Sequence, residues 1–380
     1  MKVNMDCRHF RGDRPCSPHK RHGRRCEQCE EYEPLTKKVL IVKLAADGDV
    51  LRTTCLLPAL KKELPGCHIT WVTESSAEPL LANNPLIDRV LSPPERFLPV
   101  LLAGAFDIVI NTDADIRCCS LATLSPGKEK RGFDLDEQGT IRVLSDPAME
   151  WFQLGLWDDL KRANRRSYPE IIYKIAGLEG PVSQPMLVLT DDETEDAVEH
   201  LNRCGWHKNS DRQVIGLNTG AGQRWKRKAL PVETIEHVIA NILGSSPGVD
   251  IFLLGGPEEK ERNAFLAGKY GSKVIDTGTK NSLRRFASIV SHTDVLLTAD
   301  TLAMHIGMAL RKFVVVHFGP TSPWEIDLWK NGEKLTPVMD CICCYLPDCD
   351  MSPACNERIT PEQIVKSLQK GLAHSAQGPL

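Results

Sequence analysis

The chain has few aromatic residues, no long apolar run and almost no net charge. Aromatic side chains make up 6% of its 380 residues, and the formal net charge is −3. A nearly neutral protein has no general electrostatic attraction to nucleic acid or to an anionic membrane. No stretch approaches the length of a transmembrane helix, and the start (MKVNMD) lacks the apolar segment of a signal peptide. These absences predict a cytoplasmic location.

Length and periodicity predict two domains. A chain of 380 residues exceeds the size at which a single core usually stops growing. Strand-like and helix-like patterns alternate from Lys37 onward, and the same rhythm restarts near residue 214. Such alternation is typical of parallel sheets covered by helices. We therefore expect two successive doubly wound, Rossmann-like α/β domains facing a central cleft. The expected boundaries are a polar arm at 1–36, domains at 37–205 and 206–358, and a terminal helix and tail at 359–380.

The segment 295–323 has polar residues only where its elements join. A strand at 295–298 is followed by Asp300 and Thr301, a helix through Leu310 and a second strand at 313–316. Free N–H groups at the start of such a helix favour a phosphate. Thr301 and His305 are four residues apart and share one face of the helix. The alternative is that Asp300 or Thr301 only caps the helix and that His305 is an ordinary surface histidine.

Two other loops follow strands. The loop 218–228 contains Thr219, Gly220, Arg224 and Lys228, so exposed backbone N–H groups and cations could bind a diphosphate, although basic loops are often simply solvated. After the first strand, Gly48 permits a sharp turn and Asp49 stands where a helix begins. That carboxylate could cap the helix or act as a general base.

Other polar residues follow strands of the first domain. Lys43 could neutralise an acid group of an acceptor or be solvated. Asp113 and Asp115 have a spacing that can chelate a divalent cation. Because the phosphate-seeking loops lie in the second domain, we interpret Asp113 as an acceptor-side or structural residue.

Cysteines concentrate at the two ends of the sequence, and clustered cysteines in a reducing compartment favour metal over disulfides. The two predicted four-thiolate sites, for zinc or iron, comprise Cys7, Cys16, Cys26, Cys29 and Cys341, Cys344, Cys349, Cys355. The alternatives are buried free thiols or disulfides. The arm is also rich in arginine, but because Phe10 is the one Phe, Tyr or Trp interleaved with the basic residues of 8–25, a nucleic-acid module is the weaker interpretation.

Together these segments resemble glycosyltransferase family 9, the bacterial heptosyltransferases of the lipopolysaccharide inner core. The similarity lies in residues 39–50, 60–74 and 84–90 of the first half, and in Gly220-Ala221-Gly222, 254–258, 300–305 and 318–321 of the second. The resemblance implies a GT-B fold and an inverting transfer that needs no catalytic metal. It also implies that Asp49 is the base, that Lys228, Asp300 and Thr301 hold the donor's diphosphate and sugar, and that His305 lines the same site. Together with Thr219, Gly220 and Arg224 of the glycine loop and with Glu258, these residues make up the expected donor site.

The leading hypothesis is an inverting glycosyltransferase that uses a nucleotide sugar, such as ADP-heptose, and a glycolipid or polysaccharide acceptor bound near Lys43 and Asp113. No nucleic-acid partner is expected, and peripheral contact with the cytoplasmic face of the inner membrane is possible for such an enzyme. Two alternatives differ in what they bind and turn over. A nucleotide-sugar epimerase of the same fold would convert the donor without an acceptor, and a metal-stapled binding protein would catalyse nothing.

Overall fold

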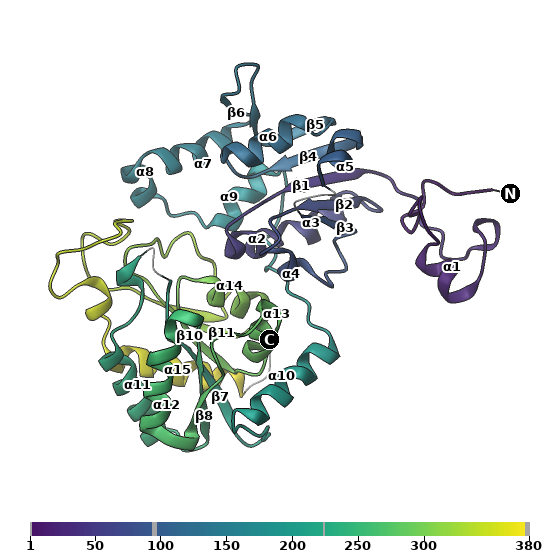
Figure 1. Cartoon of the computed structure of the whole chain (residues 1–380). Helices are drawn as coiled ribbons and strands as arrows, with labels where there is room; N and C mark the ends of the chain where they lie inside the picture. Colours follow the sequence, from purple (N-terminus) through teal and green to yellow (C-terminus); the bar gives the residue numbers. More distant parts are fainter. Residues whose placement is uncertain (1, 93–96, 223–224, 377–380) are drawn as a thin grey trace. The chain divides into compact units, whose positions relative to one another are not determined.

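The computed structural model describes residues 2–92, 97–222 and 225–376, which form two compact α/β units (Figure 1). The first unit comprises Met1–Ala46, Cys55–Phe152 and Ile171–Ser183, and the second comprises Asp47–Thr54, Gln153–Glu170 and Gln184–Leu380. The division is therefore more than a single cut near residue 205. Two segments of the first half of the chain, 47–54 and 153–170, pack with the second unit.

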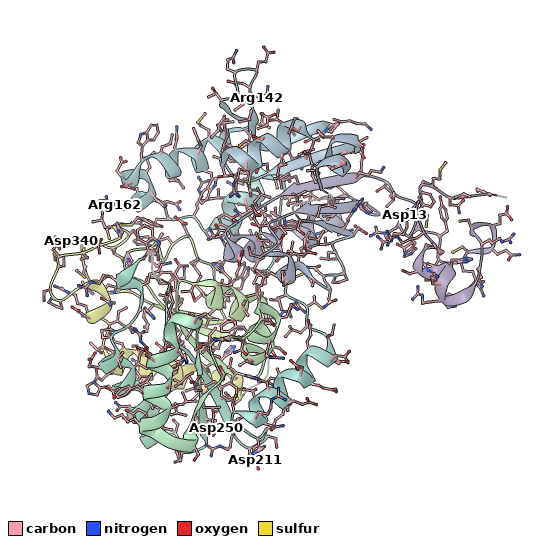
Figure 2. All side chains as sticks on the ribbon, in the orientation of Figure 1. Asp13, Arg142, Arg162, Asp211, Asp250 and Asp340 are labelled. Atoms are coloured by element: carbon pink, nitrogen blue, oxygen red, sulfur yellow. The ribbon has the colours of Figure 1, made fainter. Side chains whose placement is uncertain are left out.

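The first unit is built on a six-stranded sheet with the order β3-β2-β1-β4-β5-β6. Its strands are β1 (Lys38–Val42), β2 (His68–Val72), β3 (Arg89–Leu91), β4 (Phe106–Asn111), β5 (Gly127–Leu135) and β6 (Ile141–Val143). All pairs are parallel except β5 with β6, which form a hairpin. Figure 2 labels Arg142 on this hairpin, where its guanidinium donates to Asp134 at 2.6 Å.

Helices connect these strands and close one core over the sheet. They are α3 (Leu56–Glu63), α4 (Glu78–Leu81), α5 (Phe97–Ala103) and α6 (Ile116–Leu124), with α7 (Asp146–Leu156) and α9 (Tyr168–Ile175) each running across a division point. Leu40, Val42 and Val72 from the strands pack with Leu101 of α5 and Leu121 of α6. Near-continuous apolar strands such as β1 are what a parallel sheet covered by helices requires.

The second unit contains a fully parallel six-stranded sheet, with the order β12-β11-β10-β7-β8-β9. Its strands are β7 (Gln213–Asn218), β8 (Val249–Leu254), β9 (Val274–Asp276), β10 (Val295–Ala299), β11 (Phe313–His317) and β12 (Gly332–Leu335). The helices are α2 (Asp47–Thr53), α8 (Asp158–Ala163), α10 (Asp191–Arg203), α11 (Val232–Ser245), α12 (Lys260–Tyr270), α13 (Leu283–Ser291), α14 (Leu302–Ala309) and α15 (Pro361–Ser375). Short 3-10 turns are η2 (Lys226–Lys228), η3 (Pro257–Glu259), η4 (Gly271–Lys273) and η5 (Cys355–Glu357).

Strands β8, β10 and β11 are buried along their whole length, and alternate residues of β11 face different helices. Phe313 and Val315 of β11 join a core that includes α11 and α15, whereas Val314 and Val316 pack with Met304 of α14. This period of two is the ordinary pleat of a strand. It fixes α14 against the sheet, and therefore fixes the turn that precedes α14.

One predicted helix is divided in two. The sequence pattern predicts a continuous helix over 50–64, but α2 ends at Thr53 and α3 begins at Leu56. Pro58 lacks the N–H that would bond to the carbonyl of Thr54, so an unbroken helix loses a hydrogen bond at this point. The Thr54 hydroxyl instead donates to the carbonyl of Leu51 at 2.6 Å. The break separates α2 from the helix that belongs to the first unit.

The arm at the start of the chain contains α1 (Ser17–His22) and the 3-10 turn η1 (Cys26–Gln28). Arg8 attaches it to the first unit by donating to the Asp88 carboxylate at 2.6 Å and to the carbonyl of Cys67 at 3.0 Å. Within the described part of the chain, no helix combines the length and the apolar character needed to cross a membrane.

Candidate functional site

The turn before α14 carries polar side chains that are not used as caps. Thr301 occupies the N-cap position of α14, but its side chain makes no capping hydrogen bond. Its hydroxyl instead lies 3.1 Å from that of Thr298 and accepts from Asn218 Nδ2 at 3.4 Å. The alternative in which Thr301 merely caps the helix is therefore wrong. The turn follows β10 and contacts Asn218 at the end of the neighbouring strand β7. This edge of the sheet is where open α/β sheets bind ligands.

A lysine reaches this turn from the glycine-containing loop. Lys228 Nζ donates to the main-chain carbonyl of Asp300 at 2.6 Å and lies 3.3 Å from its carboxylate. Burial would raise the pKa of Asp300, but Lys228 and other nearby cations outweigh burial and lower it. The carboxylate is therefore ionised at neutral pH. Lys228 and Asp300 come from distant parts of the sequence, and the fold brings these two predicted donor-site residues into contact.

Helix α2 packs directly against α14. A Cβ at Gly48 would lie 2.6 Å from the Cδ2 atom of His305, so only glycine permits this approach. His305 is 5% exposed, and burial, followed by the nearby charge of Arg52, lowers its pKa to about 4. Its Nδ1 has no hydrogen-bond partner among the described groups. His305 is therefore a buried neutral imidazole, not the surface histidine of the alternative interpretation.

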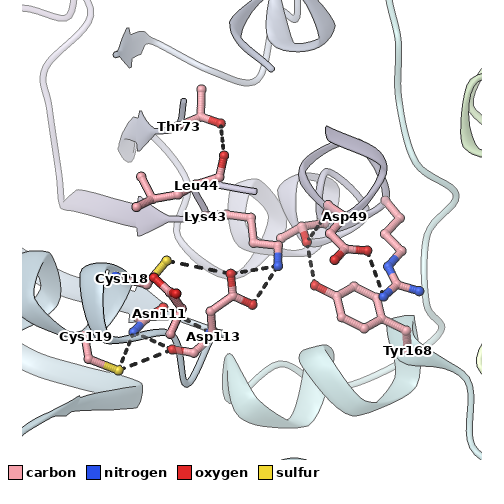
Figure 3. A network of polar contacts seen from close by, with 12 residues as sticks. Lys43, Leu44, Asp49, Thr73, Asn111, Asp113, Cys118, Cys119 and Tyr168 are labelled. Atoms are coloured by element: carbon pink, nitrogen blue, oxygen red, sulfur yellow. Dashed lines mark hydrogen bonds and ion pairs between the residues drawn. The ribbon is translucent and has the colours of Figure 1, made fainter. Parts of the chain in front are cut away.

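The predicted base, Asp49, lies in the first turn of α2 beside an arginine that the sequence analysis did not single out. Arg52 Nη2 is 2.9 Å from Asp49 Oδ1, and its guanidinium carbon lies 3.5 Å from the centre of the Tyr168 ring. Figure 3 shows Asp49 and Tyr168 within this group of contacts. Burial would lower the pKa of Arg52, but Asp49 and Tyr168 raise it overall. The i,i+3 spacing of Asp49 and Arg52 was a local signal for this pair.

A half-buried glutamate completes the group of charges. Burial raises the pKa of Glu325, and the charges of Arg52 and Lys161 partly oppose that rise. The Tyr345 hydroxyl donates to Glu325 Oε1 at 3.2 Å, and the Tyr168 N–H donates to the Glu325 carbonyl at 2.9 Å. Glu325 lies in a loop beyond β11, and no local motif in the sequence identifies it.

The glycine-containing loop differs in detail from the prediction. Thr219 is buried and its hydroxyl donates to Asn263 Oδ1 at 2.6 Å. A Cβ at Gly220 would lie 1.9 Å from Glu259 Oε1, so a larger residue here would displace the Glu259 side chain. Glu258, the predicted donor contact, is exposed in η3, whereas its neighbour Glu259 approaches the loop. Arg224 lies outside the described residues.

The predicted acceptor-side residues form a compact pair in the first unit (Figure 3). Lys43 is 2% exposed, and its Nζ donates to both carboxylate oxygens of Asp113 at 2.6 and 2.8 Å. Asn111 fixes Asp113 by accepting from its N–H at 3.0 Å and donating to its carbonyl at 3.0 Å. Asp115 caps α6 by accepting from Arg117 and Cys118 N–H groups. The carboxylates of the 113–115 stretch therefore have separate tasks.

The cysteines are all free thiols, and the members of each predicted cluster lie near one another. Cys7, Cys16, Cys26 and Cys29 line one cavity of about 270 Å³ in the arm. Burial raises the pKa of Cys355, and the neighbouring thiols of Cys344, Cys349 and Cys341 add to that rise. In the described ranges, no three His, Cys, Asp or Glu side chains are arranged to hold an ion as they stand. The two metal sites therefore remain predictions based on the donor chemistry.

The second unit thus combines a carboxylate on α2 with cations and hydroxyls around the turn before α14. Asp49 can accept a proton, while Lys228 and the N-terminal turn of α14 can stabilise negative charge that develops on a phosphate leaving group. The neutral His305 fills the space between α2 and α14. This combination is suited to a transfer reaction in which a hydroxyl attacks and an anionic group leaves.

Similar proteins have the same architecture. One relative is lipooligosaccharide heptosyltransferase 2 of Haemophilus influenzae, 21% identical over 314 residues, with 75% of this chain and 84% of that protein covered. The crystal structure of the family 9 glycosyltransferase from Veillonella parvula has a TM-score of 0.69 at 20% identity and covers 90% of this chain and 99% of that chain. The structure of E. coli ADP-heptose lps heptosyltransferase II has a TM-score of 0.66 at 15% identity and covers 89% and 99%.

These structural matches confirm the predicted fold of two parallel-sheet α/β domains of the GT-B type. A family model described as glycosyltransferase family 9 (heptosyltransferase) matches residues 96–339, which is more than half of the chain. The chain therefore belongs to glycosyltransferase family 9 and is a glycosyltransferase.

Proposed function

We propose that this glycosyltransferase moves heptose from ADP-heptose to a lipopolysaccharide-type glycolipid, with inversion at the transferred carbon. The low-identity relatives that carry heptosyltransferase names support this donor and pathway. Asp49 is the proposed base that removes the proton of the attacking hydroxyl. Lys228, Asp300, Thr301 and the N-terminal turn of α14 are the proposed donor site.

One observation carries the proposal. Gly48 allows α2 to pack on His305 of α14, so the proposed base and the proposed diphosphate site belong to one unit. The distance between base and donor site is then set by helix packing rather than by a flexible connection. Such preorganisation lowers the cost of bringing the reacting groups together.

The negative charge that develops on the leaving diphosphate has protein partners in this proposal. Lys228 supplies a full charge, and the first turn of α14 supplies oriented N–H groups. No step in the proposal uses a catalytic metal. Metal bound at either cysteine cluster would be structural, because neither cluster includes a proposed donor-site residue.

Lys43 and Asp113 are proposed to contact the acceptor. Their pair stands at the carboxyl ends of β1 and β4, the edge at which parallel sheets bind ligands. An acceptor acid group would be drawn to Lys43, and an acceptor hydroxyl to Asp113. Peripheral contact with a membrane that contains the acceptor stays a prediction, which co-sedimentation with anionic vesicles tests.

The direct test incubates the purified protein with ADP-heptose and a lipopolysaccharide acceptor truncated before its heptose. Mass spectrometry of the acceptor and NMR of the new linkage follow the products. We expect release of ADP and one added heptose whose anomeric configuration is opposite to that of the donor. Conversion of the donor in the absence of acceptor would instead establish an epimerase, and a failure to bind ADP in calorimetry would establish a non-catalytic protein.

A further inference from the structure

Arg52 is a buried cation at the centre of the proposed site, and the proposed function gives it no task. Its side chain is 11% exposed, and it is the ion-pair partner of Asp49. We propose that Arg52 is the positioning residue for Asp49, holding that carboxylate ionised and in one orientation for proton removal. This inference rests on the proposed function, because it assumes that Asp49 is the base.

The guanidinium is fixed from two sides. Arg52 Nη2 lies 2.9 Å from Asp49 Oδ1, and the plane of the group is supported by the Tyr168 ring at 3.5 Å. An arginine held in this way over an aromatic ring has one preferred orientation. The carboxylate that pairs with it is consequently restricted too. A lysine could supply the charge at this position but not the planar contact with the ring.

A second chain of contacts returns from the ring to the base. The Thr53 hydroxyl donates to the main-chain carbonyl of Asp49 at 2.6 Å. It lies 2.9 Å from the Tyr168 hydroxyl, which must then be the donor of that contact because the Thr53 proton is already used. Side chain and main chain of Asp49 are thus both tied to Tyr168, one through Arg52 and one through Thr53. This closed set of contacts lies within the second unit.

The surroundings keep Arg52 charged. The charged or titratable groups that act on it are Asp49 on α2, Tyr168 on α9, Glu325 in the loop after β11, and Asp300 and His305 at α14, with Lys228 paired to Asp300. Burial opposes the charge, but the carboxylates more than compensate and raise the pKa of Arg52. Its Nε nevertheless has no hydrogen-bond partner among the described groups. A buried donor without a partner costs stability, which an apolar side chain at this position would avoid.

The expected direction of the pH effect follows from simple electrostatics. A neighbouring cation favours the ionised form of a carboxylate, and only the ionised form can accept the proton. Removing the cation therefore moves the acid limb of the kcat/KM profile to higher pH. His305 cannot produce this limb in the neutral range, because burial lowers its pKa to about 4.

The test compares Arg52→Met, Arg52→Lys and Arg165→Met by measuring kcat/KM against pH, with ADP binding measured by calorimetry. Arg165 is a matched control in the same unit, since its guanidinium lies 3.8 Å from the Trp324 ring but contacts no proposed site residue in the described structure. We expect Arg52→Met to shift the acid limb upward by roughly one pH unit. The plateau of kcat/KM should fall on the order of tenfold, because Asp49 is no longer held in one orientation. Arg52→Lys should restore the limb but only part of the plateau, and Arg165→Met should leave the limb in place.

The proposal is overturned if the limb of Arg52→Met stays where it is in the wild type, or if Arg52→Lys is no better than Arg52→Met. Should Arg52→Met fail to fold, the comparison of Arg52→Lys with Tyr168→Phe replaces it, and an unchanged plateau in both contradicts the proposal. Asp49→Asn separates this failure from failure of the proposed function. If Asp49→Asn retains normal transfer, the base assignment is wrong, whereas an inactive Asp49→Asn with an unmoved limb in Arg52→Met refutes only the role of Arg52.

Discussion

Each unit contains a largely buried lysine–aspartate pair near the carboxyl end of its sheet, but the two pairs are built differently. Lys43 donates to both carboxylate oxygens of Asp113, and Asn111 also holds that aspartate through its main chain. Lys228 donates at 2.6 Å to the main-chain carbonyl of Asp300, and its Nζ is 3.3 Å from the carboxylate. The first pair matches its charges at close range, while the second leaves the Asp300 carboxylate at a looser distance.

The two pairs also differ in the charged groups that surround them. Around Lys228 and Asp300 lie a buried arginine, a neutral histidine and a glutamate whose pKa burial raises. Several charges concentrated in one place are costly for folding, and such arrangements are typical of functional sites. The comparison is consistent with a second unit in which stability is lost for the proposed chemistry, whereas the pair of the first unit stabilises its own fold beside its proposed contact with the acceptor.

The largest effect on stability is expected at the pair of Lys43 and Asp113. Lys43→Met removes the ammonium group that donates to both Asp113 oxygens and should destabilise the first unit by about 3 kcal/mol. Hydrogen exchange resolved by peptide measures this loss separately for each unit. In the double variant that combines Lys43→Met with Asp113→Asn, most of the stability should return. If the KM for the acceptor is then raised while the KM for the donor is unchanged, the pair is a binding site for the acceptor. A Lys43→Met protein as stable as the wild type would remove the contrast between the two pairs.

At the pair of Lys228 and Asp300, replacing the lysine with methionine should affect turnover more than stability. Lys228→Met removes the cation proposed to stabilise the leaving diphosphate, and kcat should fall on the order of 10²–10³-fold. Steady-state assays with saturating donor measure this change, and unfolding by urea measures stability on the same sample. Loss of stability comparable to that of Lys43→Met, without a large loss of kcat, would mean that both pairs are structural.

The two units should also differ in acid. Burial lowers the pKa values of His305 and His317 to about 4, so both rings are uncharged in the folded second unit. An unfolded histidine takes up a proton below about pH 6.5. Stability is therefore complete above that value and is lost as pH falls from 6.5 toward 4, by roughly 2 kcal/mol per histidine at pH 4.5.

Hydrogen exchange at pH 7 and pH 4.5 tests this expectation, and the second unit should lose protection first. The variant His317→Gln serves as the control. Because glutamine does not titrate in this range, the second unit of this variant should lose less protection at pH 4.5 than that of the wild type. Equal loss of protection in both units would contradict the assigned origin of the effect.

Local sequence patterns predicted the parts of the site that depend on local structure. Asp300, Thr301 and His305 could be placed because strand, turn and helix follow one another over a few residues. Tyr168 and Glu325 could not, because their approach to α2 depends on packing between segments more than a hundred residues apart, as in the contact of Thr53 with Tyr168. Arg52 was accessible from its spacing to Asp49, but an i,i+3 pair is common on helix surfaces.

The fold was predicted more completely than its details. Apolar runs were sufficient for the inner strands of both sheets, since each of these strands is recognisable within a few residues. The edge strands β6 and β12 and the polar strand β5 have no such run and were not predicted. The break between α2 and α3 was missed although Pro58 marks it, and this break is what lets α2 belong to the second unit. Likewise, Glu259 rather than Glu258 approaches Gly220, because a 3-10 turn places successive side chains in different directions.

The central claim is that the base and the donor site of this glycosyltransferase occupy one unit and have separate tasks. Asp49→Asn, assayed for transfer in single turnover with ADP-heptose and for ADP binding by calorimetry, tests it most directly. We expect a loss of transfer on the order of 10²–10⁴-fold with unchanged ADP affinity. Transfer at a near-normal rate would contradict the role of Asp49, and a large loss of ADP affinity would contradict the separation of base from donor binding.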